Sequence, residues 1–135
     1  MTDLKQLARD IFHETLAGVD IPRTFGRKLQ FDGSRLSIGE VATGAGHTYS
    51  PPLSIDFANY RSIRAVAMGK ASAAMARGLV ERLPPGIPLQ GVLAAPHDAL
   101  ADVAGFRVIG TSHPIPDEGS FTAARAILDL LAGAD

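Results

Sequence analysis

The stretch that decides the fold reads Ser62-Ile63-Arg64-Ala65-Val66-Ala67-Met68-Gly69-Lys70-Ala71. Its apolar part predicts a buried strand over Ile63 to Met68, and the small residues after Gly69 predict a helix from Lys70 to Leu83. The helix is expected to bury one face, made of Ala71, Ala74, Met75, Gly78 and Leu79. A strand that turns directly into a helix points several free backbone N–H groups and the Lys70 ammonium at one place. Gly69, Lys70 and Ala71 therefore predict an anion-binding site.

A second segment with candidate functional residues is Ser112-His113-Pro114-Ile115-Pro116-Asp117-Glu118-Gly119-Ser120. It follows the short apolar run Arg107 to Gly110, so it lies at the carboxyl end of a predicted strand, where open α/β sheets bind ligands. The prolines stiffen the turn that presents His113, Asp117 and Glu118. The same residues also fit a structural role, in which Asp117 and Ser120 cap the last helix. The two roles are compatible.

The remaining patterns predict a small α/β protein that forms a single partial domain over 1–135. An amphipathic helix is expected from Leu4 to Val19, with Thr2 or Asp3 as its cap, and Lys28 to Ile38 reads as a hairpin around Asp32-Gly33. Gly39 to Leu53 reads as a loop. Further strands are expected over Gln90 to Ala95 and Arg107 to Gly110, each followed by loop residues and with spacing typical of βαβ units. A closing helix after Ser120 is marked by Phe121, Ala124, Leu128 and Leu131. The predicted fold class is a three-layer α/β/α structure with a mostly parallel, Rossmann-like sheet, preceded by an N-terminal helix and a small hairpin.

Composition narrows the function classes. The 13 basic residues nearly cancel the 14 acidic ones, so neither nucleic acid nor a membrane surface is predicted as a partner. The absence of cysteine excludes a disulfide framework and a zinc–thiolate site, and it fits a reducing compartment. The first residues do not resemble a signal peptide, and no apolar run approaches the ~20 residues that span a bilayer. We therefore expect a cytoplasmic protein.

The sequence also lacks the motifs of several common functional sites. Gly44-Ala45-Gly46 is not a dinucleotide fingerprint, because Tyr49 occupies the place of the third glycine and no buried strand precedes it. Neither a Walker loop nor a Gly-x-Ser-x-Gly elbow is present. The four histidines (His13, His47, His97 and His113) lack ligand spacing, so no dedicated metal site is predicted.

Taken together, these segments resemble the amino-terminal part of the glycerate 2-kinase family of the MOFRL type, which is often labelled hydroxypyruvate reductase. The resemblance covers nearly the whole chain and is carried by Arg9-Asp10-Ile11-Phe12, the Lys28 to Ile38 hairpin, Val66-Ala67-Met68-Gly69-Lys70-Ala71 with Met75-Ala76, and His113-Pro114-Ile115-Pro116-Asp117-Glu118. Two positions depart from the family pattern, since Ala67 and Ser112 stand where glycine is usual.

The resemblance implies an ATP- and Mg²⁺-dependent transfer of the γ-phosphoryl group to the 2-hydroxyl of D-glycerate, in a cleft between two α/β domains. Lys70 falls on the active-site lysine of the family. Relatives continue beyond the point where this sequence stops, into a second, C-terminal domain that is absent here. We therefore expect the N-terminal portion of a two-domain kinase that is inactive as an isolated chain.

Two other interpretations remain open. The chain could be a noncatalytic stand-alone domain that binds a small anion, or that forms a homodimer through exposed apolar surface. An NAD-linked reductase, as the older label suggests, ranks lower because no Gly-x-Gly-x-x-Gly follows a predicted strand.

Overall fold

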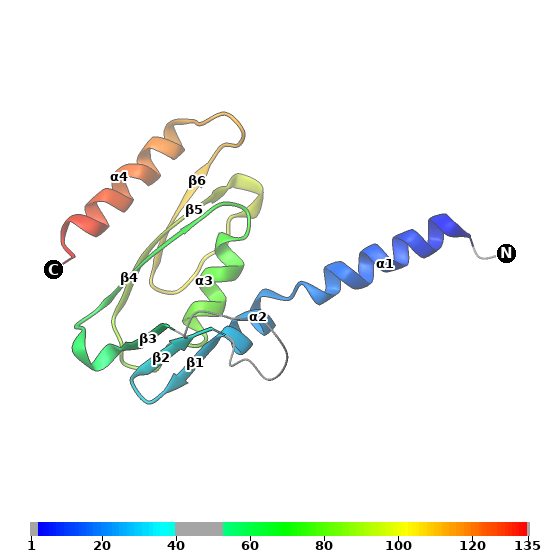
Figure 1. Cartoon of the computed structure of the whole chain (residues 1–135). Coiled ribbons are helices and arrows are strands. Elements are labelled where there is room, and N and C mark those ends of the chain that lie inside the picture. Colours follow the sequence, from blue (N-terminus) through cyan, green and yellow to red (C-terminus); the bar gives the residue numbers. More distant parts are fainter. Residues whose placement is uncertain (1–2, 40–52, 135) are drawn as a thin grey trace.

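The computed structural model describes residues 3–39 and 53–134 and contains two three-stranded sheets (Figure 1). In chain order the elements are α1 (Leu4–Gly18), α2 (Ile21–Lys28), β1 (Leu29–Asp32), β2 (Arg35–Ile38), β3 (Leu53–Asp56), β4 (Ile63–Met68), α3 (Ser72–Val80), β5 (Leu89–Pro96), β6 (Phe106–Thr111) and α4 (Glu118–Ala132), with 3-10 turns at Phe57–Asn59 and His97–Ala99. The predicted loop from Gly39 to Leu53, with its Gly44-Ala45-Gly46 and His47, lies almost entirely outside the described residues.

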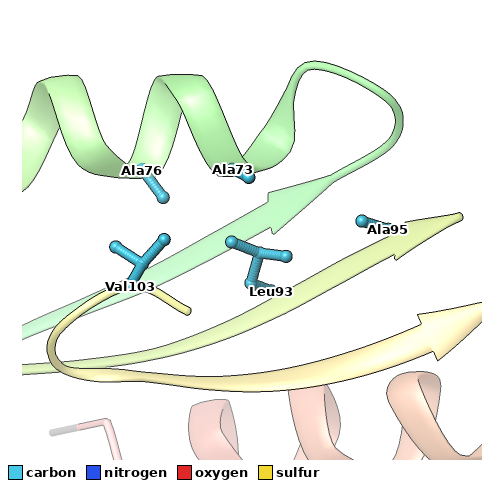
Figure 2. Close-up of a cluster of buried hydrophobic side chains, with 5 residues drawn as sticks. All are labelled: Ala73, Ala76, Leu93, Ala95 and Val103. Atoms are coloured by element: carbon cyan, nitrogen blue, oxygen red, sulfur yellow. The ribbon is translucent and has the colours of Figure 1, made fainter. Parts of the chain in front are cut away.

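The second sheet is parallel, with strand order β4-β5-β6, and carries α3 on one face and α4 on the other. Its α3 side holds a buried cluster of Ala73, Ala76, Leu93, Ala95 and Val103 (Figure 2). Its α4 side holds Val92, Ala94, Ile109, Ala123 and Ala126. Alanine at these contacts lets each helix approach the sheet closely. The predicted three-layer α/β/α class is confirmed.

The first sheet is antiparallel, in the order β1-β2-β3. The predicted hairpin is confirmed, and Gly33 in its turn has a φ of 59°, a conformation that glycine adopts at little cost. The sequence did not predict β3 or α2. Helix α2 begins after Asp20, whose carboxylate accepts the Arg23 N–H at 3.2 Å, and Phe25 packs against Gly78 of α3.

The helices and connections of the α/β part differ in detail from the sequence prediction. Helix α3 is shorter than the predicted Lys70 to Leu83, and it buries Ser72, Ala73, Ala76 and Gly78, whereas Ala71 and Met75 are exposed. The closing helix that Phe121, Ala124, Leu128 and Leu131 indicated is confirmed as α4, which buries Ala123 and Ala126 and leaves those four residues exposed. A 3-10 turn and a loop connect β5 to β6, so the loop residues expected after β5 are confirmed, whereas the βαβ spacing is not filled by a helix here.

Helix α1 extends away from the rest of the molecule (Figure 1). Asp3 caps it by accepting the Lys5 N–H at 3.0 Å, as predicted. All its residues are exposed, including the apolar positions Leu4, Leu7, Ile11, Phe12 and Leu16. Its apolar stripe therefore has no partner within residues 3–39 and 53–134. No helix among these residues is long and apolar enough to cross a membrane.

Candidate anion site at the carboxyl edge of the parallel sheet

The loops that follow β4, β5 and β6 lie at the same edge of the parallel sheet (Figure 1). They contain Gly69 to Ala71, His97 to Ala99 and Ser112 to Asp117, respectively. The topology thus brings both predicted segments, one around Lys70 and one around His113, to the edge where open α/β sheets bind ligands.

In the turn between β4 and α3 the Ser72 N–H donates to the Gly69 carbonyl oxygen at 3.1 Å, whereas the N–H groups of Lys70 and Ala71 have no hydrogen-bond partner among the described residues. Gly69 has a φ of 97°, which turns the chain sharply, and its N–H still donates to the Ala94 carbonyl oxygen of β5 at 2.9 Å. Ala71 is the N-cap residue of α3 and provides no side-chain cap. Lys70 is exposed, and its ammonium has no hydrogen-bond or ion-pair partner in the described part of the chain. A cation beside an uncapped helix start is unfavourable without an anion, so this arrangement favours a negatively charged ligand.

Ser72, the first residue of α3, adds an unsatisfied group beside this turn. Its side chain is only 1% exposed, and its Oγ has no hydrogen-bond partner among the described residues. It lines a pocket of about 330 Å³ with Phe25, Met68, Met75 and Phe106, among others. Buried hydroxyl groups are usually hydrogen-bonded, so this one is available to a ligand or to a water molecule.

Asp117 stabilises the β6–α4 turn through hydrogen bonds with Ser112 and Ser120. Its Oδ2 accepts the Ser112 hydroxyl at 2.6 Å, and its Oδ1 accepts the Ser120 N–H at 3.0 Å. The Asp117 N–H in turn donates to Ser120 Oγ at 3.2 Å, which completes a capping box. The Ser112 hydrogen bond, followed by those from Ser120, lowers the pKa of Asp117 well below its usual value, against the opposing effect of burial. The capping role considered from the sequence is therefore confirmed.

His97 is a site residue that sequence reasoning missed. Its Nε2 lies 3.6 Å from Asp117 Oδ2, and its ring packs so closely on Gly110 that a Cβ there would lie 2.6 Å from the ring. The sequence contains one signal for this role, because His97 stands two residues after the predicted strand Gln90 to Ala95, at its carboxyl end. It was overlooked because its partners, Gly110 and Asp117, become neighbours only once β5 and β6 pair.

The other predicted binding residues lie on the same turn. His113 is exposed and precedes Pro114 through a cis peptide bond, and Glu118 is exposed in the first turn of α4. Their predicted contact with substrate, and that of Asp117, stays a prediction. Within residues 3–39 and 53–134, no three His, Asp or Glu side chains gather closely enough to hold a metal ion.

The capping box makes a prediction about acid stability. Because the pKa of Asp117 is lower in the folded chain than in the unfolded chain, its contribution to stability is present above about pH 4 and is lost as the pH falls below that value. Asp117→Ser keeps a capping oxygen but cannot titrate. In urea unfolding the wild type is expected to be the more stable at pH 7, and the difference should shrink steadily between pH 4 and pH 2. A difference that stays constant over this range would contradict the assignment.

Comparisons with known proteins agree with this fold. Residues 7–135 match the family model described as "Domain of unknown function (DUF4147)". The PH0495 protein from Pyrococcus horikoshii OT3 has a similar structure, with a TM-score of 0.71 and 20% sequence identity over 99% of this chain. The chain spans 27% of that protein's length, and the likeness at this identity shows the fold alone. A comparison with curated proteins gives no match. Because the family model covers nearly all of the sequence, the chain belongs to the DUF4147 family.

Proposed function

We propose that this chain is the N-terminal, anion-binding portion of a glycerate 2-kinase, which transfers the γ-phosphoryl group of ATP to the 2-hydroxyl of D-glycerate. The observation that carries the proposal is the Lys70 ammonium, which has no partner among residues 3–39 and 53–134 and lies beside the uncapped start of α3, at the edge where open α/β sheets bind ligands. The resemblance of this turn and of the His113 to Glu118 segment to glycerate kinases supports the same conclusion.

The chemistry of phosphoryl transfer suits such a site. The reaction depends on positioning and on neutralising negative charge more than on covalent chemistry. Lys70 supplies one full positive charge, and the free N–H groups at the start of α3 supply oriented dipoles. Both can hold either a phosphate of ATP or the carboxylate of glycerate. ATP, when bound, supplies the phosphoryl group.

Magnesium does not fit the residues described here. Asp117, the carboxylate most fixed at this edge, already accepts hydrogen bonds at both of its oxygens. Glu118 and Asp98 are exposed, and the described residues contain no group of three potential ligands. We therefore assign no step of the reaction to a metal held by this chain, and we expect the isolated chain to lack kinase turnover.

The alternative is a noncatalytic domain that binds an anion or self-associates. The exposed apolar faces of α1 and α4 favour it. Light scattering over a range of concentrations tests self-association, and a clean monomer at high concentration would count against a dimerising domain.

A coupled ADP-release assay with the purified chain, D-glycerate and Mg-ATP tests the proposed function. We expect turnover far below ~1 s⁻¹, the low end of the usual kinase range. In parallel, NMR titration with inorganic phosphate or D-glycerate should shift the amide signals of Gly69 to Ser72. Turnover of ~1 s⁻¹ would refute the claim of inactivity. Amide signals that do not move with either anion would refute the anion site itself.

A further inference from the structure

Helix α1 is apolar along one side but buries none of it. Its large apolar side chains are 44–78% exposed, and the helix extends away from the rest of the molecule (Figure 1). Isolated helices of ~12–15 residues are only marginally stable in water, because most helical stability in proteins comes from the packing of an apolar face. With 15 residues, α1 therefore needs a partner surface for its apolar stripe of Leu4, Leu7, Ile11, Phe12 and Leu16.

An apolar groove of about 330 Å³ lies beside α3, between this helix, β4 and α2. Its lining includes Phe25, Met68, Ser72, Met75 and Leu79. Met68 is 70% exposed and Met75 is 47% exposed, so large apolar side chains remain open to solvent here. The groove runs along α3 from Ser72 to Leu79, since residues three and four positions apart share one face of a helix. A groove of this kind suits an amphipathic helix that lays its apolar face into it.

The apolar stripe and the groove each contain a hydroxyl group. Ser72 Oγ is buried in the groove and has no hydrogen-bond partner among residues 3–39 and 53–134. Thr15 shares the apolar face of α1, because it follows Ile11 by four residues, and its hydroxyl donates to the Ile11 carbonyl oxygen at 2.7 Å. The Thr15 oxygen can therefore accept a hydrogen bond from Ser72. Since most of the stripe precedes Thr15, this contact places α1 antiparallel to α3, with Phe12 beside Met75.

The connection between α1 and α2 is too short for α1 to enter the groove of its own chain in this direction. Helix α2 lies beside the carboxyl end of α3 (Figure 1), where Phe25 packs against Gly78. The last turn of α1 has to lie at the other end, next to Ser72, and the nine residues of α3 are ~13 Å long. Val19 and Asp20 form the whole connection and reach ~7 Å at most. A second copy of the chain has no such limit.

We propose that two copies of this chain exchange α1, so that the helix of each copy lies in the groove of the other. The exchanged helix runs antiparallel to α3, with Thr15 against Ser72 and Phe12 against Met75. Exchange of an identical element is a low-cost route to a dimer, and a short hinge favours it. The proposal does not depend on the kinase assignment, because it rests on α1 and the groove and not on Lys70, and the titration with anions tests that site separately.

The size of the contact favours a reciprocal exchange. A helix of 15 residues is ~22 Å long and ~10 Å wide, so each α1 covers ~220 Å² of a partner surface. Two such contacts, counted on both surfaces, remove roughly 900 Å² from solvent, close to the ~1,000 Å² that a specific interface needs. A contact made by only one of the two helices would remove half of this area.

Disulfide cross-linking tests which surfaces meet, because the chain contains no cysteine of its own. A Phe12→Cys chain is mixed with a Met75→Cys chain and oxidised, and mass spectrometry counts the linked peptides. Leu128 on α4 is more exposed than Met75 and lies on the other face of the sheet, so a Leu128→Cys chain is the matched control partner. Disulfides require Cα atoms within ~7 Å, and we expect at least about tenfold more of the 12–75 link than of the 12–128 link. Equal yields of the two links would overturn the proposal.

Lengthening the hinge tests the exchange itself. Six Gly and Ser residues inserted between Val19 and Asp20 raise the reach of the connection to ~27 Å, which allows α1 to enter the groove of its own chain. Light scattering at high concentration should show a dimer for the original chain and a monomer for the lengthened one. In the lengthened chain that carries both Phe12→Cys and Met75→Cys, the disulfide should form within one chain. An original chain that is monomeric, or a lengthened chain that is as dimeric as the original, would overturn the exchange.

Discussion

Gly119→Ala is expected to destabilise the fold by about 3 kcal/mol, although glycine to alanine within a helix usually stabilises by ~0.5–1 kcal/mol. A Cβ at Gly119 would collide with the carbonyl oxygen of Gly110 and would lie 3.1 Å from Asp117 Oδ1. Neither neighbour can move freely. Gly110 belongs to β6 and pairs with Ala95 in the sheet, and Asp117 is held by the capping box. The start of α4 would have to lift from the sheet.

Urea unfolding at pH 7 measures this effect. Gly18→Ala is the matched control, because Gly18 also lies in a helix and a Cβ there would meet no atom within 4 Å. That variant should change the free energy of unfolding by less than about 0.5 kcal/mol or should stabilise the chain. If Gly119→Ala behaved like Gly18→Ala, the close approach of α4 to the end of β6 would be wrong.

Much of the local structure could be predicted because short-range chemistry determines it. The apolar run that ends at Gly69 defines β4, and Asp32-Gly33 defines the hairpin. Asp3 and Asp117 act as helix caps, as their positions before apolar stripes indicated. In each case the decisive residues lie within a few positions of one another in the sequence.

Features that depend on tertiary packing were not predictable in this way. Helix α2 is only eight residues long and contains Gly26, and it is supported by the contact of Phe25 with Gly78, although Asp20 and Pro22 at its start are residues typical of a helix N-terminus. The expected face of α3 was right at Gly78, which is buried, and wrong at Ala71 and Met75, which are exposed. Close packing on the sheet instead selects alanines such as Ala76 and Ala126, and the larger side chains lie on surface that the described chain does not cover.

The same distinction applies to the candidate site. The turn at Lys70 was predictable because a strand, a glycine and a helix follow one another directly. The approach of His97 to Asp117 was not, since the two residues are 20 positions apart and meet only through the pairing of β5 with β6. The Ser72 hydroxyl, which has no hydrogen-bond partner in the described part of the chain, could not be predicted either, because its burial results from the packing of α3 on the sheet.

Lys70→Ala is expected to weaken the binding of inorganic phosphate or D-glycerate to the chain by at least about tenfold. A hydrogen bond between charged groups contributes ~1.5–3 kcal/mol, and each ~1.4 kcal/mol corresponds to a factor of ten in affinity. The N–H groups at the start of α3 remain in the variant, so weak binding should survive. In an active kinase the same substitution should lower kcat/KM by at least ~10²-fold, because the charge that Lys70 meets grows in the transition state.

NMR titration of the Gly69 to Ser72 amides measures the affinity, and two variants separate a local effect from one of net charge. Lys5→Ala removes the same charge from α1, which lies far from the sheet edge, and should leave the affinity unchanged. Lys70→Arg keeps the charge and should retain most of the binding, with altered geometry. Equal weakening by Lys5→Ala and Lys70→Ala would show only general attraction between the chain and anions, screened by salt. An affinity of Lys70→Ala within threefold of the wild type would make Lys70 an ordinary surface lysine, and the anion site would then have to lie elsewhere on this edge.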